Sequence, residues 1–286
     1  MGRSMRAPNL PSALLGLGAL AALAACRPGG AAPDAPREAT ETVPDAPFPE
    51  GPHKHPSNVQ QFGVEVLAVF DHDPTAFTQG LELRDGVLYE STGLYGESEI
   101  RRVEPSTGAI LDAQSLPDEH FGEGLTLTED VVWQLTWKAG VAYRRDPITL
   151  EVIDTVAYEG EAWGICYDGT RLVVSDGSAT LTFRDPITFE KQGTVAVTSD
   201  GGHLAQLNEL ECAYGRVWAN VWLTDHIVRI NPANGEVEAS VDASGLLTEE
   251  ESATADVLNG IAVAEEANTF YLTGKLWPHV FLVEFL

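Results

Sequence analysis

A carboxylate, three carboxamides and an indole stand at equivalent places in five similar segments of the chain. Each directly precedes one position of an aligned set, which holds Gly80, Gly124, Gly164, Glu209 and Gly260; the five side chains are those of Gln79, Glu123, Trp163, Asn208 and Asn259. One carboxylate can accept a proton and later return it, and amide donors can stabilise an oxyanion. A purely structural requirement would repeat, as the glycine does. The differences between the five side chains therefore favour a chemical site.

A second set of side chains follows at a fixed distance. Thirteen residues beyond the aligned position stand Gly93, Trp137, Gly177 and Trp222, and the fifth segment, two residues longer, places Lys275 there. Phe77 and Phe121 precede the first set by two residues, where the third segment has Glu161. Singly, such aromatic residues are more often packing residues. Together, the two sets predict an aromatic pocket with one carboxylate, amides and one lysine, in which Glu161 should matter less than Glu123.

The five segments recur at intervals of about 40–50 residues, which is typical of a repeat architecture. Each continues into two short apolar runs, such as 81–83 and 87–89, and four of them carry a proline turn such as Asp146-Pro147-Ile148-Thr149 before a further run. Four short strands per repeat, with no helical periodicity between them, predict an all-β, five-bladed β-propeller. Because the first strand of each blade lines the central channel, the equivalent positions should converge at one mouth.

The fifth segment ends at Leu286 with no room for a fourth strand. Residues 64–70 form a strand-like run before the first segment that has no other partner. We therefore expect this N-terminal strand to become the missing outer strand and to close the ring, which would remove two open sheet edges.

Residues 1–25 are typical of a signal peptide, because two arginines and no acidic residue accompany a short apolar run from Leu14 to Ala25. The run is too short for an ordinary membrane span. Leu23-Ala24-Ala25-Cys26 resembles the lipobox of bacterial lipoproteins, which implies cleavage before Cys26 and lipidation of its thiol. An ordinary secretory signal with an incidental cysteine is the alternative.

Residues 26–58 are rich in Pro, Ala, Gly and acidic residues and poor in large apolar ones. Such a segment cannot offset its ordering entropy by burial, so we expect a disordered, fairly extended tether. It would join lipidated Cys26 to a propeller domain at residues 59–286. The predicted location is the periplasm or outer membrane of a bacterium, or its cell surface.

The chain is strongly acidic, with 17 Lys and Arg against 43 Asp and Glu and a formal net charge of −26. A field of this sign disfavours nucleic acid and anionic lipid as partners. We expect contact with a membrane only through the lipid anchor, and a monomer.

Cys166 and Cys212 fall in the first strands of the third and fourth segments. An exported protein could form a disulfide. We expected innermost strands of different blades to splay apart, however, and buried free cysteine is common. The expectation is therefore two free thiols. No metal-binding, phosphate-loop or dinucleotide motif is present.

From about Phe62 to Phe285 the chain resembles the plant-type and bacterial glutaminyl-peptide cyclotransferases, a family of five-bladed propellers. The resemblance rests on Phe77-Thr78-Gln79-Gly80-Leu81, Phe121-Gly122-Glu123-Gly124-Leu125, Leu207-Asn208-Glu209-Leu210-Glu211, Asn220-Val221-Trp222, Leu258-Asn259-Gly260-Ile261-Ala262 and Thr273-Gly274-Lys275-Leu276-Trp277-Pro278. One departure is visible, because Ala162 replaces the first glycine of the family's Glu-Gly-Trp-Gly pattern.

The resemblance implies cyclisation of the N-terminal glutamine of a peptide or protein to pyroglutamate, with loss of ammonia. Glu123 would shuttle the proton, and Gln79, Asn208 and Lys275 would hold the oxyanion. The substrate would be bound by Phe77, Phe121, Trp137, Trp163, Trp222 and Asn259. No cofactor is required in this scheme, although the resemblance allows a structural calcium in the channel.

Two alternatives belong to other functional classes. The first is a lactonase-type propeller hydrolase that uses Glu123, Asn208 and Asn259 as oxygen ligands of Ca²⁺. The second is a propeller that binds peptides without catalysis. The first would depend on metal for turnover, and the second would bind a glutamine-initiated peptide without releasing ammonia.

Overall fold

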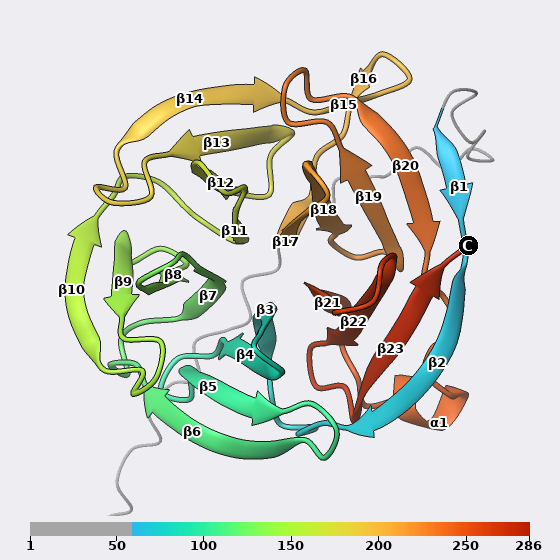
Figure 1. Ribbon diagram of the computed structural model, residues 1–286, viewed down its shortest axis with the longest axis horizontal. Helices are drawn as coiled ribbons and strands as arrows, with labels where there is room; N and C mark the ends of the chain where they lie inside the picture. The colour runs from blue at the N-terminus through green and yellow to red at the C-terminus, as the bar shows by residue number, and fades with distance from the viewer. Residues whose placement is uncertain (1–58) are drawn as a thin grey trace, which may run out of the picture. The chain divides into compact units, whose positions relative to one another are not determined.

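A computed structural model describes residues 59–286 of the chain, which form five antiparallel sheets arranged around a central channel (Figure 1). This confirms the predicted five-bladed propeller. The predicted signal peptide, tether and lipidated Cys26 lie outside the described residues. No helix in the described part of the chain is long and apolar enough to cross a membrane.

Each blade contributes its first strand to the channel and its last strand to the rim (Figure 1). Blade 1 consists of β3 (Thr78–Arg84), β4 (Val87–Thr92), β5 (Glu99–Glu104) and β6 (Ala109–Ser115); blade 2 of β7 (Gly122–Leu127), β8 (Val132–Thr136), β9 (Val141–Arg145) and β10 (Val152–Ala157); blade 3 of β11 (Ile165–Tyr167), β12 (Leu172–Val174), β13 (Thr180–Arg184) and β14 (Lys191–Ala196).

Blade 4 consists of β17 (Leu207–Ala213), β18 (Arg216–Val221), β19 (His226–Ile230) and β20 (Val237–Asp242), and blade 5 of β21 (Leu258–Val263), β22 (Thr269–Gly274), β23 (His279–Phe285) and β2 (Val64–Asp71). A small hairpin of β15 (Thr198–Ser199) and β16 (Gly202–His203) joins blades 3 and 4, and the short helix α1 (Glu249–Ser252) joins blades 4 and 5.

The proline turns form because the residue before each proline bonds the turn backbone. Asp146 Oδ1 accepts hydrogen bonds from the amides of Ile148 and Thr149, at 2.9 and 2.8 Å. The turn at Asp185 repeats this pattern. The side chain thereby stabilises the tight reversal between the third and fourth strands.

The N-terminal strand closes the ring as predicted. β2 pairs antiparallel with β23, from Val64 opposite Phe285 to Asp71 opposite His279. A further strand, β1 (Gln60–Phe62), was not predicted; it pairs parallel with β20 and extends blade 4 to five strands. The same short segment therefore joins the outer edges of blades 4 and 5 (Figure 1).

The aligned glycines are required because the innermost strands touch backbone to backbone. A Cβ at Gly80 would lie 2.5 Å from the amide nitrogen of Leu125, and one at Gly164 would lie 2.2 Å from the carbonyl oxygen of Asn208. Gly124 is equally confined, and its amide donates to the carbonyl of Trp163 in the next blade at 2.7 Å. Three successive blade contacts therefore exclude any side chain at this position.

Polar side chains replace these backbone contacts where the ring closes. Glu209 holds the glycine position in blade 4, and its carboxylate accepts hydrogen bonds from the amides of Ile261 at 2.9 Å and Leu81 at 3.3 Å. One buried side chain thus links blade 4 to blades 5 and 1. Burial raises the pKa of Glu209 well above its usual value, although the two amides oppose the shift.

The expectation of two free thiols is wrong, because Cys166 and Cys212 form a disulfide with a Cα–Cα distance of 5.3 Å. The two cysteines lie on β11 and β17, the neighbouring innermost strands of blades 3 and 4. Blades splay apart toward the rim, but the contact at Gly164 holds these inner strands together. The inner ends of blades 3 and 4 are therefore close enough for a disulfide, although their outer ends diverge.

Deletion of residues 62–70 should lower the melting temperature or abolish cooperative unfolding, because it removes most of β2 and leaves β23 with an open edge. Thermal unfolding followed by circular dichroism measures this effect. Deletion of residues 26–57, which keeps both N-terminal strands, is the control. An unchanged cooperative melt of the 62–70 deletion would contradict the closure.

Replacement of both disulfide cysteines by alanine should lower the free energy of unfolding. For a loop of 46 residues the chain-entropy relation gives about 4 kcal/mol. Denaturant unfolding of the native chain with and without reductant measures the cross-link itself. Reductant should have no effect on the Cys166→Ala/Cys212→Ala variant, and equal stability of the oxidised and reduced native chain would contradict the prediction.

Candidate active site

Four of the five residues of the first set lie at β-bulges on the innermost strands. The pairing register shifts between Thr78 and Gly80 in blade 1 and between Gly122 and Leu125 in blade 2. Equivalent shifts flank Asn208 and Asn259. A bulge interrupts the ladder and re-aims a side chain. The bulges therefore explain how residues within a strand present their side chains at the mouth of the channel.

The fifth residue, Trp163, lies just before β11 rather than within it. Its amide bonds the carbonyl of Ser175 at 2.9 Å, and the amide of Gly164 bonds the Ser175 hydroxyl at 2.8 Å. The replacement of glycine by Ala162 leaves this turn intact, and the Ala162 methyl group is buried in the apolar core between blades 2 and 3.

Backbone hydrogen bonds bring the second set of residues beside the first. The amide of Gly93 bonds the carbonyl of Phe77, and the amide of Trp137 bonds that of Phe121, at 2.8 and 3.0 Å. Trp222 and Lys275 make the same bond in their blades, to Gln206 and Val257. The predicted convergence of the two sets is therefore built into the blade repeat.

The two glycines of the second set make room for aromatic rings. A Cβ at Gly93 would lie 2.4 Å from the ring of Phe121, and one at Gly177 would lie 2.5 Å from the ring of Trp163. Where the second set has a tryptophan instead, the rings meet edge to face. The centroids are 5.6 Å apart for both Phe121–Trp137 and Trp163–Trp222.

The five aromatic residues form one half-buried wall, consisting of Phe77, Phe121, Trp137, Trp163 and Trp222. Phe77 meets Phe121 edge to face at 6.1 Å. A cavity of about 190 Å³ lies beside Phe77 and Gly93, but none of the first-set residues lines it, so it is not the site itself. The wall offers apolar faces to a small ligand and keeps it close to the polar residues of the first set.

Three polar side chains at this mouth are buried without a polar partner. Glu123, Asn208 and Lys275 are 4%, 3% and 6% exposed. Among the described residues, their side chains make no hydrogen bond or ion pair, and Lys275 Nζ instead lies 4.8 Å from the centre of the Phe77 ring. None of their polar atoms is among the fully enclosed, unpartnered atoms of the described residues, so these atoms stay open to the mouth, where a ligand can pair with them.

Burial controls the ionisation of the acid and the lysine. It raises the pKa of Glu123 well above its usual value, a shift that Lys275 opposes and Glu161 reinforces. It lowers the pKa of Lys275, against the attraction of Glu123 and Asp256. Both groups can therefore exchange protons more readily than their exposed counterparts.

Asn259 holds the side chain of Gln79 in place by a hydrogen bond. It has no exposed surface, and its Nδ2 donates to the carbonyl of Thr78 at 3.0 Å and to Gln79 Oε1 at 3.2 Å. The side-chain oxygen of Gln79 is thereby occupied, so its Nε2 is the group left to face a ligand. Asn259, predicted from sequence to bind the substrate, thus also holds the side chain of Gln79.

Glu161 makes direct hydrogen bonds to the aromatic wall, which its sequence position did not indicate. Its Oε2 accepts hydrogen bonds from the indole nitrogens of Trp137 at 2.9 Å and Trp163 at 3.3 Å. Lys138 lies over the Trp137 ring and 3.9 Å from Glu161 Oε1. One exposed carboxylate therefore fixes two of the three tryptophans at this mouth.

A buried charged network holds the loop that carries Lys275, and sequence analysis missed it. His72 Nδ1 lies 2.7 Å from the carbonyl of Trp277, and His72 Nε2 lies 2.9 Å from Glu90. Glu90 also accepts from Thr78 Oγ1 at 2.6 Å and from Arg101 Nε at 2.8 Å. Burial alone would lower the pKa of His72, but the Glu90 carboxylate raises it. The network thereby links Lys275 to Gln79, which follows Thr78.

The structural calcium that the resemblance allows stays a prediction for the described residues. They contain no group of three or more His, Cys, Asp and Glu side chains that could hold a metal ion. The channel carboxylates of Glu82 and Glu209 instead accept backbone amides, from Leu127 at 2.9 Å in the case of Glu82. Asn259, an oxygen ligand in the lactonase alternative, bonds Thr78 and Gln79 through its Nδ2, and its Oδ1 has no hydrogen-bond partner among the described residues.

Comparisons with known proteins agree with this arrangement. The sequence profile described as "Glutamine cyclotransferase" matches residues 40–285. The chain is 38% identical over 226 residues to "Glutaminyl-peptide cyclotransferase" of Arabidopsis thaliana, which covers 77% of this chain and 71% of that protein. It is similar to the crystal structure of Myxococcus xanthus glutaminyl cyclase with a TM-score of 0.72 and 35% identity, over 79% of this chain and 98% of that one. The chain therefore belongs to the glutamine cyclotransferase family.

Proposed function

We propose that this protein is a glutaminyl-peptide cyclotransferase, which converts the N-terminal glutamine of a peptide or protein to pyroglutamate and releases ammonia. Family membership supports this activity. The observation that carries the assignment of residues is the group of three buried, unpartnered polar side chains beside an aromatic wall. This group offers an acid–base residue and hydrogen-bond donors at one place, which the reaction needs.

The aromatic wall binds the substrate's glutamine side chain and excludes water from it. Cyclisation needs the α-amine close to the side-chain amide carbon, and a confining pocket supplies that geometry. Glu161 keeps the Trp137 and Trp163 rings in place through their indole nitrogens. Its role is therefore to position the wall rather than to touch the reacting atoms.

Glu123 moves the proton. The α-amine attacks the amide carbon and loses a proton to the Glu123 carboxylate, and the same group then protonates the departing nitrogen, which leaves as ammonia. Burial raises the pKa of Glu123, so its protonated form is a weaker acid and its carboxylate a stronger base. Only the ionised form accepts the proton, so the rate should rise with pH through this raised pKa.

Gln79, Asn208 and Lys275 stabilise the oxyanion of the tetrahedral intermediate. Asn259 occupies Gln79 Oε1, which leaves the Nε2 donor for the substrate oxygen. Asn208 and Lys275 are buried and have no polar partner of their own among the described residues. Donors held in place before the reaction need no reorganisation as charge develops, which lowers the barrier. The scheme requires no cofactor.

Substitution Glu123→Gln should lower kcat by at least about 10²-fold, because one general acid–base group typically contributes about 10²–10⁴-fold. KM should change little, since the aromatic wall supplies most of the binding. Release of ammonia from a glutamine-initiated dipeptide, with and without chelator, measures both constants and also tests for a dependence on metal.

Glu161→Gln is the matched control. It removes a charge that raises the pKa of Glu123, yet it retains an oxygen that can accept from an indole nitrogen. We expect a smaller loss of kcat than in Glu123→Gln and a shift of the pH profile to lower pH. Near-full activity of Glu123→Gln together with an inactive Glu161→Gln would show that Glu123 is not the residue that transfers the proton.

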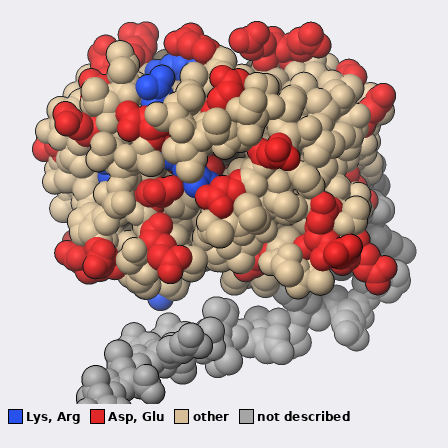
Figure 2. Space-filling model, turned by 90° about the horizontal axis from the view of Figure 1, so that it is seen from below, with Lys and Arg blue, Asp and Glu red and all other residues tan. Residues whose placement is uncertain are grey.

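For its location, we propose export and attachment to a bacterial membrane through lipidated Cys26. The support is the lipobox-like sequence and the composition of residues 26–58. The acidic surface is consistent with this, since Asp and Glu are spread over the side shown in Figure 2 with few Lys or Arg among them. Such a surface repels anionic lipid and nucleic acid, so the propeller itself should stay off the membrane, as a monomer.

Substitution Cys26→Ser should release the protein from membranes, because the thiol is the proposed site of lipid attachment. Ammonia-release activity in the membrane and soluble fractions of the cell reports the distribution. The propeller is untouched, so total activity should stay constant and move to the soluble fraction. Persistent sedimentation of the active variant with membranes would refute the anchor.

A further inference from the structure

An aromatic residue on the second strand of a blade faces an arginine on the third strand in three of the blades. The pairs are Tyr89 with Arg102, Trp133 with Arg144, and Trp218 with Arg229, directly opposite each other in the sheet. The guanidinium lies 5.8, 5.5 and 5.7 Å from the ring centre. The repeat thus places the same pair of hydrogen-bond donors beside the next blade.

Both members of the pair in blade 1, and the aromatic member in blade 2, bind the proline turn of the next blade. Tyr89 donates its hydroxyl to the carbonyl of Pro147 at 2.8 Å, and Arg102 donates to that of Ile148 at 3.0 Å. Trp133 donates its indole nitrogen to the carbonyl of Pro186 at 3.1 Å. The aromatic donor is therefore the shared receptor for an Asp-Pro turn, and in blade 1 the arginine adds a second hydrogen bond.

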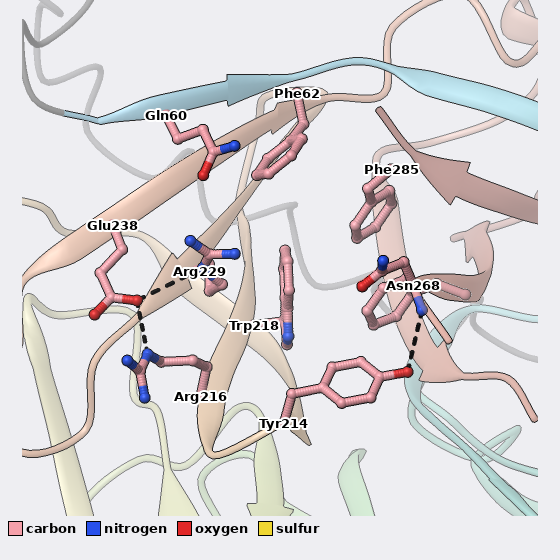
Figure 3. Close-up of a pocket in the computed structure, with 10 residues that line it drawn as sticks. Gln60, Phe62, Tyr214, Arg216, Trp218, Arg229, Glu238, Asn268 and Phe285 are labelled. Carbon is pink, nitrogen blue, oxygen red and sulfur yellow. Dashed lines mark hydrogen bonds and ion pairs between the residues drawn. The ribbon is translucent and has the colours of Figure 1, made fainter. Parts of the chain in front are cut away.

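Blade 4 has the receptor, but blade 5 has no turn to fill it. The third and fourth strands of blade 5, β23 and β2, come from opposite ends of the propeller domain and are not joined by a turn. Trp218 is 5% exposed, and its indole nitrogen has no hydrogen-bond partner. A cavity of about 480 Å³ lies at this place, between Trp218 and the two ends that close the ring (Figure 3).

We propose that this cavity is a peptide-binding socket, which takes an Asp-Pro turn from another polypeptide. The carbonyl of the proline accepts the Trp218 indole N–H, as in the filled contacts. The proline ring packs on Phe62, Phe270 and Phe285, which line the cavity. The bound turn thereby occupies the place of the proline turn that blade 5 lacks.

The charges of the cavity fit an acidic residue before the proline. Arg216 Nε lies 2.6 Å and Arg229 Nε 3.6 Å from the single carboxylate oxygen Glu238 Oε2 (Figure 3). Two guanidinium groups share one carboxylate, so a positive charge remains in an otherwise acidic protein. A ligand carboxylate would complete the pairing, since guanidinium groups bind carboxylates well.

Access requires side chains at the rim of the cavity to turn. The indole nitrogen of Trp218 points toward Arg216 and Tyr214 (Figure 3) and is screened from water. Tyr214 is 57% exposed, and the Arg216 side chain is 36% exposed. Exposed side chains change rotamer readily, so the donor can be uncovered without movement of the strands.

The socket is separate from the active site. Tyr214 and Arg216 flank the turn from β17 to β18, whereas Asn208 and Trp222 stand at the opposite ends of these two strands. A peptide in the socket therefore does not compete with a substrate at the mouth. Because it spans both sides of the closure, it should also stabilise the ring.

A synthetic peptide with the sequence of residues 145–150, acetylated and amidated at its ends, is the probe. Titration calorimetry of the full chain should show binding with Kd on the order of 1 mM or tighter. A saturating concentration should raise the melting temperature, since the ligand binds only the folded state. Ammonia release should be unchanged. Absence of binding at several millimolar would overturn the proposal.

Variants separate the socket from nonspecific association. Trp218→Phe keeps the ring but removes the donor and should weaken binding at least tenfold. Trp133→Phe removes the same donor at a filled contact and should leave binding unchanged. Arg216→Gln, at the exposed rim, should also weaken binding. Equal binding of a scrambled peptide, or no difference between the two tryptophan variants, would show that the socket is not the site.

Discussion

The close approach of the five innermost strands governs this structure. At Gly80, Gly124 and Gly164 the neighbouring backbone lies where a Cβ would stand, so the channel is too narrow for side chains at these positions. The residue just before each aligned position is then forced out of the ladder at a bulge or a turn. Packing in the channel therefore fixes where chemistry can occur, because the expelled side chains gather at the mouth.

The close packing of the channel also determines the pKa values of the residues at its mouth. Side chains that emerge beside a packed channel and under an aromatic wall are poorly hydrated, which raises the pKa of Glu123 and lowers that of Lys275. The two groups attract each other, but they do not form an ion pair among the described residues. A contact ion pair would hold both charges in the resting enzyme. Unpaired, the two groups remain available to the substrate instead.

Repetition made the blades, the ring closure by β2 and the two sets of mouth residues predictable from sequence. Each of these features follows from counting residues or strands along the five repeats, which requires no coordinates. The disulfide between Cys166 and Cys212 was not predictable in this way, because its formation depends on how closely β11 and β17 approach. The buried His72–Glu90–Arg101 network depends on contacts between side chains 11 to 18 residues apart in sequence, and no periodic pattern marks it.

Glu161 and Trp218 show a further limit of the periodic argument. Glu161 stands where two other blades have phenylalanine, so the alignment marked it as different but gave no partner for it. The structure supplies the partners, because the indoles of Trp137 and Trp163 converge on its carboxylate. Trp218, in contrast, follows the repeat, but its indole nitrogen has no partner because blade 5 lacks the proline turn that the other blades have. In a ring of near-identical units, a new interaction can arise where a residue changes or where an unchanged residue meets a changed neighbour. Only the first kind is visible in the sequence, and the second requires the neighbour to be placed in space.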